Sequence, residues 1–96
     1  MLTETQRNII IETLKPYNPT RIGIFGSVAR GKATDESDID ILYQFDNKVG
    51  LFTLMDIIEK LESKLKKKVD LVSEKYVNPL LKPEILKDLT VIYEQN

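Results

Sequence analysis

Two aspartates inside a short apolar segment constrain this chain more than any other feature of its sequence. Asp38 and Asp40 alternate with Ile39 and Ile41 in the stretch DIDIL. Because successive side chains of a strand point to opposite faces, we expect both carboxylates on one face and both isoleucines on the other. Paired carboxylates do not suit an apolar core, whereas Mg²⁺ prefers carboxylate oxygens as protein ligands. The sequence therefore predicts a strand over residues 39–45 that begins at a cation site.

A glycine–serine pair supplies a second candidate component of the same site. The apolar run Ile22–Phe25, which belongs to a strand expected over residues 21–25, ends in Gly26-Ser27, and ten residues separate this pair from Asp38. A glycine lets a ligand approach the backbone closely, and Ser27 is a favourable N-cap for a short helix over residues 28–31. Backbone N–H groups at a helix N-terminus bind phosphate. A phosphate cradle beside paired carboxylates indicates metal-assisted phosphoryl or nucleotidyl transfer.

A third acidic residue repeats the pattern further along the chain. The segment Val69–Ser73 reads as a strand, in which Val69 and Leu71 face one side and Asp70 the other. If this strand neighbours 39–45, Asp70 can join the first two aspartates on one face. The alternative is an exposed aspartate near a sheet edge. We favour the functional interpretation because charged residues are depleted from strand centres.

Arg30 is the one basic residue near the glycine–serine pair that we single out. It lies one helical turn beyond Ser27, where a guanidinium group could bind phosphate oxygens. It could equally be a surface arginine paired with Asp35 or Glu36, and the sequence leaves both interpretations open. The following Gly31 is expected to end the short helix.

The remaining segments predict a layered fold. Thr3 and Gln6 form a capping box for a helix that ends before Pro16. A helix near 83–87, or one that begins at 78, and an edge strand over 89–93 are expected at the end of the chain. The amphipathic stripe of a helix from residue 51 predicts these core residues: Leu51, Leu54, Met55, Ile58, Leu61 and Leu65. Helices alternating with strands predict an α/β or α+β fold, a small mixed sheet of three or four strands with helices packed against it.

Length and composition narrow the possible functions. With 96 residues, we expect residues 1–96 to form a single domain. The net charge of −1 gives no general attraction to nucleic acid or a membrane. The chain has no His and no Cys, which argues against zinc and excludes a thiol nucleophile and a histidine base. No signal peptide is visible, so we expect a cytoplasmic protein. An edge strand over 89–93 could also pair two copies of the chain.

The stretch GSVARGKATDESDIDIL resembles the signature of the DNA-polymerase-beta-like nucleotidyltransferases, and within them the minimal nucleotidyltransferases of prokaryotes. The resemblance extends to the third acidic strand, since the family also uses an acidic residue there. It implies that Asp38, Asp40 and Asp70 are catalytic and hold Mg²⁺, with two ions expected. We further expect Gly26 and Ser27 to bind the triphosphate of ATP, with Arg30 as a third nucleotide-binding candidate whose alternative role remains open.

The same resemblance implies a partner. Minimal nucleotidyltransferases commonly act as antitoxins beside small helical HEPN-domain toxins, which are ribonucleases, and the family is associated with transfer of AMP to a tyrosine of that toxin. We therefore expect a protein adenylyltransferase and antitoxin. Two alternatives remain: transfer to the hydroxyl of a small molecule such as an aminoglycoside or of an RNA end, and a binding module that neutralises the toxin without catalysis.

Overall fold

The computed structural model describes residues 2–34 and 36–95, and in this part of the chain it forms one sheet flanked by helices. The elements in chain order are α1 (Glu4–Leu14), a 3₁₀ helix η1 (Lys15–Tyr17), β1 (Pro19–Phe25), α2 (Gly26–Ala29), β2 (Ile39–Phe45), α3 (Leu51–Leu65), β3 (Val69–Ser73), α4 (Lys82–Asp88) and β4 (Thr90–Glu94). The sheet has four strands in the order β3-β2-β1-β4. β1 runs antiparallel to β2 and β4, whereas β2 and β3 are parallel, joined through α3. The predicted mixed sheet with packed helices is confirmed.

Local signals set most element boundaries. β2 and β3 have the predicted bounds, and β4 is the predicted edge strand, shifted by one residue. The capping box of α1 is present: the Thr3 hydroxyl accepts a hydrogen bond from the Gln6 backbone N–H at 3.1 Å, and the Gln6 side chain accepts one from the Thr3 N–H at 3.0 Å. α4 begins at Lys82, close to the later of the two predicted starts.

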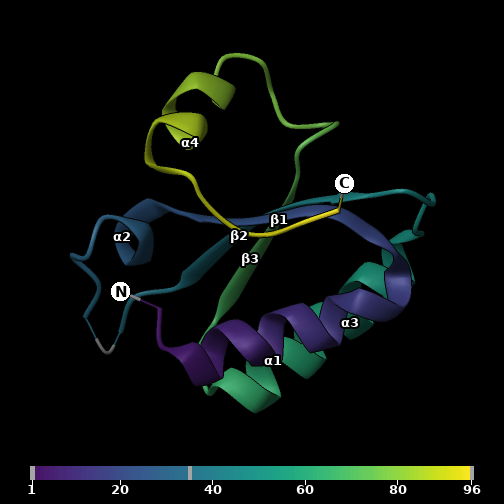
Figure 1. Cartoon of the computed structure of the whole chain (residues 1–96), viewed down its shortest axis with the longest axis horizontal. Helices are drawn as coiled ribbons and strands as arrows, with labels where there is room; N and C mark the ends of the chain where they lie inside the picture. The colour runs from purple at the N-terminus through teal and green to yellow at the C-terminus, as the bar shows by residue number, and fades with distance from the viewer. Residues whose placement is uncertain (1, 35, 96) are drawn as a thin grey trace.

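One face of the sheet is covered by α1 and α3, and the apolar core lies between these two helices and the sheet (Figure 1). Ile22 and Ile24 of β1, Ile39 and Ile41 of β2 and Val69 of β3 all point into this core. Their burial fixes the register, because a slip of one residue would move every apolar side chain to the opposite face. The polar alternate residues of the same strands must therefore lie on the other face.

The predicted apolar stripe of α3 is wrong at two positions. Leu51 and Met55 are exposed, whereas Ile57, Leu61 and Leu65 are buried. The buried residues are four positions apart and face α1 and the sheet. Leu51 and Met55 lie about a quarter-turn to the side of this stripe, at 100° per residue. The sequence pattern located the helix correctly, but it placed the centre of the buried face nearer to Leu51 and Met55 than the structure does.

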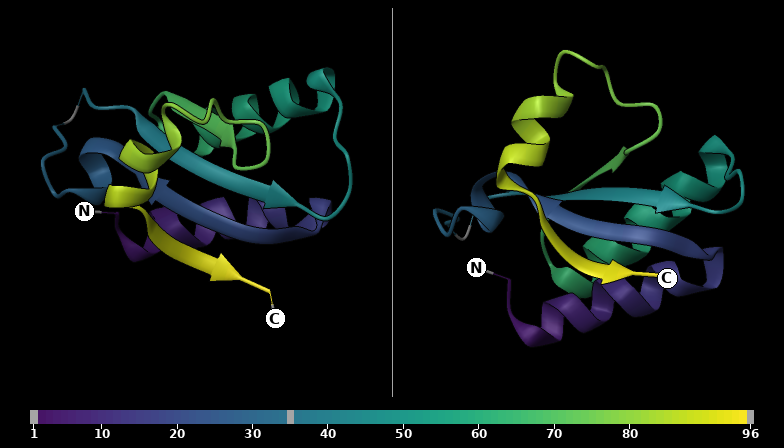
Figure 2. Two further views of the ribbon diagram at one scale, coloured as in Figure 1. Left: turned by 90° about the horizontal axis from the view of Figure 1, so that it is seen from above. Right: turned by 45° about the horizontal axis from the view of Figure 1, so that its top comes forward.

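The second face of the sheet, which we call the open face, carries α4 and the loop before it (Figure 2). Leu89, directly after α4, packs over Gly23 of β1 so closely that a Cβ at position 23 would lie 2.5 Å from a Leu89 methyl carbon. The strand glycine therefore provides the space in which the end of α4 docks. Within residues 2–34 and 36–95, no helix is long and apolar enough to cross a membrane.

Candidate active site

Asp40 and Asp70 are direct neighbours on the open face. The parallel pairing of β2 with β3 sets Ile39 opposite Val69 and Asp40 opposite Asp70. The burial of Ile39 and Val69 in the core forces both aspartates outward, as the alternation of each strand predicted. The charge of Asp70 therefore acts on Asp40 and raises the pKa of the Asp40 carboxyl, in addition to the larger effect of its partial burial. The structure thus brings together two of the three predicted carboxylates through strand register alone.

Gly26 closes the site from the end of β1. Phe25, the last residue of β1, pairs with Asp40, so that Gly26 follows beside the aspartate. Gly26 has φ = 75°, a left-handed conformation that favours glycine. A Cβ at this position would collide with the Asp40 carboxylate. Both the backbone conformation and the space beside Asp40 therefore require a glycine, for a reason more specific than the close ligand approach expected from the sequence.

Asp40 experiences an unfavourable environment for a negative charge. Its partial burial raises its pKa above the ordinary value, and the charges of Asp70 and Asp38 raise it further, while the charge of Arg30 lowers it. Asp38 is exposed and lies one residue before β2, close enough for its charge to act on Asp40. The three predicted carboxylates thus share one electrostatic environment.

The chemistry of these residues fits a divalent cation, although they do not surround a ready-made cavity for one. In the part of the chain that the structure describes, no group of three acidic side chains is already arranged around a metal position. Asp40 and Asp70 nevertheless present adjacent carboxylates, and the Asp40 carboxylate lies against Gly26, in the space that a side chain at position 26 would fill. A bound cation would offset the repulsion that raises the Asp40 pKa.

Ser27 does not have the predicted capping role. α2 begins at Gly26, its N-cap is Phe25, and no side chain caps it. Because Gly26 adopts the left-handed conformation, the chain turns one residue earlier than a serine cap would require. Ser27 instead lies within the first turn, whose backbone N–H groups have no intrahelical partner. Gly31 has φ = 72° and ends the helix as predicted.

Arg30 pairs with a residue that the sequence did not indicate. Its Nη1 donates to Oδ2 of Asp88, the last residue of α4, at 2.8 Å. It does not pair with Glu36, and the alternative partner Asp35 lies outside the described residues. Asp88 is 58 positions away in the chain, so no local pattern could have revealed the contact. The glycine at position 23 was the available hint, because a strand glycine often marks a close backbone or side-chain approach.

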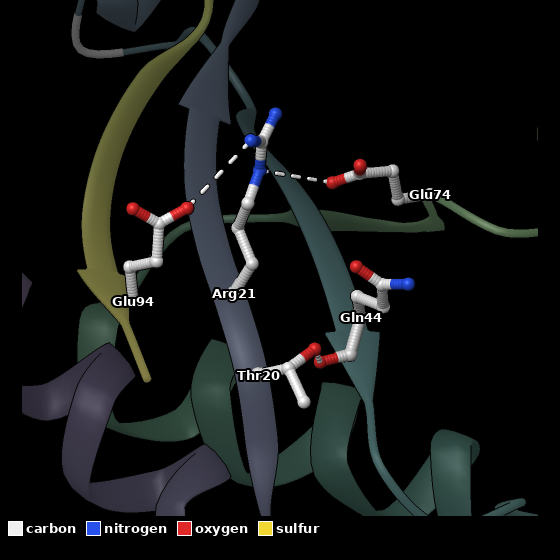
Figure 3. A network of polar contacts seen from close by, with 5 residues as sticks. All are labelled: Thr20, Arg21, Gln44, Glu74 and Glu94. Carbon is white, nitrogen blue, oxygen red and sulfur yellow. Dashed lines mark hydrogen bonds and ion pairs between the residues drawn. The ribbon is translucent and has the colours of Figure 1, made fainter. Parts of the chain in front are cut away.

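The other end of the open face carries a different charged group, which we call the arginine bridge: Arg21, Glu74 and Glu94 (Figure 3). Arg21 Nε lies 3.1 Å from Glu74 Oε1, and its Nη1 lies 3.8 Å from Glu94 Oε2. Arg21 extends from β1 between carboxylates on either side of it, and beside it the Thr20 hydroxyl donates to the Gln44 carbonyl at 3.1 Å. These acidic residues have an internal cation, in contrast to Asp38, Asp40 and Asp70.

Comparisons with known proteins agree with this arrangement. A family model described as polymerase beta, nucleotidyltransferase, matches residues 8–96. A Methanocaldococcus jannaschii relative, provisionally named a protein adenylyltransferase, is 43% identical over 79 residues, which are 79% of each chain. The protein adenylyltransferase MntA of Thermococcus cleftensis is 31% identical over 81 residues, 84% of this chain and 82% of that protein. A crystal structure of a toxin–antitoxin with AMP-PNP superposes with a TM-score of 0.84 at 25% identity, over 94% of this chain and 74% of that one.

The family model covers the whole sheet, including the strand ends that carry Gly26, Asp40 and Asp70. Residues 8–96 are most of the chain, and two relatives exceed 30% identity over more than two thirds of both sequences. The chain therefore belongs to the polymerase beta nucleotidyltransferase family.

Proposed function

We propose that this protein is a metal-dependent protein adenylyltransferase, which moves AMP from ATP to a tyrosine hydroxyl of a cognate HEPN-domain toxin and thereby acts as its antitoxin. The observation that carries the proposal is the register of β2 and β3, which sets Asp70 beside Asp40 at the edge of Gly26. The names of two relatives of the chain, which include the words protein adenylyltransferase, support the proposal. So does the similar solved structure of a toxin–antitoxin with AMP-PNP.

The triphosphate would lie against Gly26 and Ser27. The backbone N–H groups of this turn are free of helical partners and suit phosphate oxygens. The missing side chain of Gly26 lets the Asp40 carboxylate lie directly against this turn, so that the phosphates would bind next to that carboxylate. Arg30 would add a cation on the same side, because its charge already acts on Asp40.

Asp38, Asp40 and Asp70 would hold Mg²⁺, and we expect two ions. These side chains would hold the ion, and its positive charge would offset the negative charge that develops on the oxygens of the α-phosphate. Asp40 and Asp70 offer adjacent oxygens from neighbouring strands, and Asp38 offers a third carboxylate at the start of β2. The mutual repulsion of these side chains supports a role that includes a cation.

Asp70 is the best candidate to accept the proton of the attacking hydroxyl. The chain contains no histidine, and Asp70 is the more exposed member of the Asp40–Asp70 pair. The tyrosine oxygen would bond to the α-phosphorus as the bond to the β-phosphate oxygen breaks. AMP would then remain on the toxin and pyrophosphate would leave.

A labelled-transfer assay tests the proposal. The protein is incubated with the toxin encoded beside it, Mg²⁺ and ATP labelled on the α-phosphate, and the modified residue is located by mass spectrometry. We expect label on a toxin tyrosine, lost in Asp40→Asn and retained in the control Asp56→Asn, which removes an exposed aspartate of α3. Neutralisation of the toxin by Asp40→Asn without any label would instead favour a binding module.

A further inference from the structure

The ion pair between Arg30 and Asp88 is not a simple surface contact. Arg30 is 46% exposed and Asp88 only 24%, and a single guanidinium nitrogen, Nη1, contacts the carboxylate. A guanidinium group has five N–H donors. Within residues 2–34 and 36–95, neither Nε nor Nη2 of Arg30 has a hydrogen-bond partner. One edge of the group is thus fixed to α4 while the rest remains able to bind an anion.

The position of Asp88 is fixed by the helix that precedes it and by the residues that follow it. It is the last residue of α4, and the next residue, Leu89, packs over Gly23 of β1. Thr90 then pairs with Ile24 in the sheet. Asp88 therefore sits on a support joined to the same strand that leads to Gly26, and such rigid support is what a well-positioned site needs.

Arg30 also lies close to the candidate active site. It follows α2 directly, and its backbone N–H donates to the Gly26 carbonyl at 3.1 Å, while the Asp40 carboxylate lies against Gly26. α4 contacts both α2 and β1. Asp88 thus holds one nitrogen of a guanidinium group whose own backbone lies one helical turn from Gly26, and the other donors of that group have no partner among the described residues.

We propose that Asp88 is a positioning residue, which holds the Arg30 guanidinium at the side of the site so that its free donors meet the triphosphate. The inference rests on the proposed function only in taking a nucleoside triphosphate as the ligand. It assigns a role to the end of α4, a segment that neither the acidic strands nor the glycine–serine turn includes.

The sign of the effect separates positioning from simple electrostatics. Asp88 is an acidic residue near an anion site, so removal of its charge alone should strengthen binding of a triphosphate. Removal of a positioning contact should weaken binding, because the freed arginine loses conformational entropy when it binds. If Asp88 merely sequestered Arg30, its removal would again strengthen binding.

The experiment is calorimetric titration of the full chain with AMP-PNP and Mg²⁺. We expect Asp88→Asn to weaken binding about 3–10-fold, a coupling typical of residues in contact. Arg30→Ala should weaken it roughly 10–100-fold, as expected for loss of charge-assisted hydrogen bonds. In the Arg30→Ala background, Asp88→Asn should cause no further loss. Glu84→Gln, which removes an exposed carboxylate from the same helix, is the matched control and should leave binding unchanged.

Unchanged or tighter binding by Asp88→Asn would overturn the inference, and so would an equal loss in the Arg30→Ala background, which would indicate a general structural defect. Wild-type protein that binds AMP-PNP but never labels the toxin would end the proposed function and leave this inference standing. A wild-type protein that binds no AMP-PNP would overturn both.

Discussion

The two ends of the open face both carry clustered carboxylates, but only one end has a cation built into it. At the arginine bridge, Arg21 lies between Glu74 and Glu94, and the side chains of Arg21 and Glu74 are only 28% and 18% exposed. At the other end, Asp40 and Asp70 lie side by side and Asp38 is near enough for its charge to act on Asp40, and no ion pair joins any of the three to a cation in the part of the chain that the structure describes. Among the residues described, Arg30 is the cation whose charge reaches Asp40, and its ion pair is with Asp88.

This difference distinguishes structural charge clusters from functional ones. The arginine bridge joins β1, β4 and the end of β3, so its charges stabilise the sheet. At the aspartate end, partial burial raises the pKa of Asp40, and repulsion by Asp70 and Asp38 raises it further. A protein keeps an arrangement of this kind where function requires it, and perturbed carboxylates gather at functional sites. The following variants test whether the two ends differ as this contrast states.

The largest effect should come from Asp40→Asn in the transfer assay. Loss of one oxygen ligand at the centre of the site should reduce the rate at least about 1,000-fold, or about 4 kcal/mol of transition-state stabilisation. Glu94→Gln at the arginine bridge removes the same kind of charge from the same face and should leave the rate unchanged. Equal losses in the two variants would show that the ends are not functionally distinct.

Gly26→Ala should disrupt the site through a steric collision. The new Cβ would displace the Asp40 carboxylate, and a residue with φ = 75° would add strain of about 1–2 kcal/mol. Gly31→Ala is the matched control, because Gly31 has φ = 72° but open space around its Cβ position. We expect similar decreases in Tm from backbone strain and a much larger loss of transfer activity in Gly26→Ala. Equal activities would contradict the close approach of Gly26 to Asp40.

Arg21→Ala should destabilise the protein without impairing chemistry. It leaves the partly buried Glu74 without its cation, and we expect a loss of about 1–2 kcal/mol, or roughly 5–10 °C in Tm. Glu94→Gln should have a smaller effect, because its contact with Arg21 is long and more exposed. Thermal denaturation followed by circular dichroism measures both. A Tm for Arg21→Ala equal to that of the wild type would show that the arginine bridge does not stabilise the sheet.

The smallest effect, and the one of opposite sign, should be that of Asp40→Asn on stability in the absence of metal. The substitution removes a partly buried charge that Asp70 and Asp38 repel, so Tm should rise by about 2–5 °C. Asp46→Asn, which removes an exposed charge just after β2, should leave Tm unchanged. A lower Tm for Asp40→Asn would mean that the carboxylate already has a stabilising partner.

Much of this site could be predicted from the sequence because strand alternation is a local property. The bounds of β2 and β3, and the common face of Asp40 and Asp70, follow from apolar residues at every second position. The parallel pairing that makes them neighbours does not follow from the sequence pattern. It depends on α3 crossing over the sheet, and the phase of the buried stripe of α3 was itself predicted incorrectly.

The features that the sequence did not predict depend on contacts between distant segments. Ser27 was expected to cap α2, but Gly26 turns the chain one residue earlier. The Arg30–Asp88 pair depends on how α4 docks, and that docking in turn depends on the space that Gly23 leaves for Leu89. Neither the charge of Asp88 nor its neighbours in the sequence indicates that it pairs with Arg30.

The central claim, that the aspartate end is completed by a cation, is tested most directly by the effect of Mg²⁺ on thermal stability. We expect Mg²⁺ to raise the Tm of the wild-type protein and to leave the Tm of Asp38→Ala unchanged, because that variant has lost one of the three carboxylates. Asp56→Ala, a control on α3, should respond to Mg²⁺ as the wild type does. Equal shifts in the wild type and in Asp38→Ala would mean that the ion binds elsewhere, and would contradict the claim.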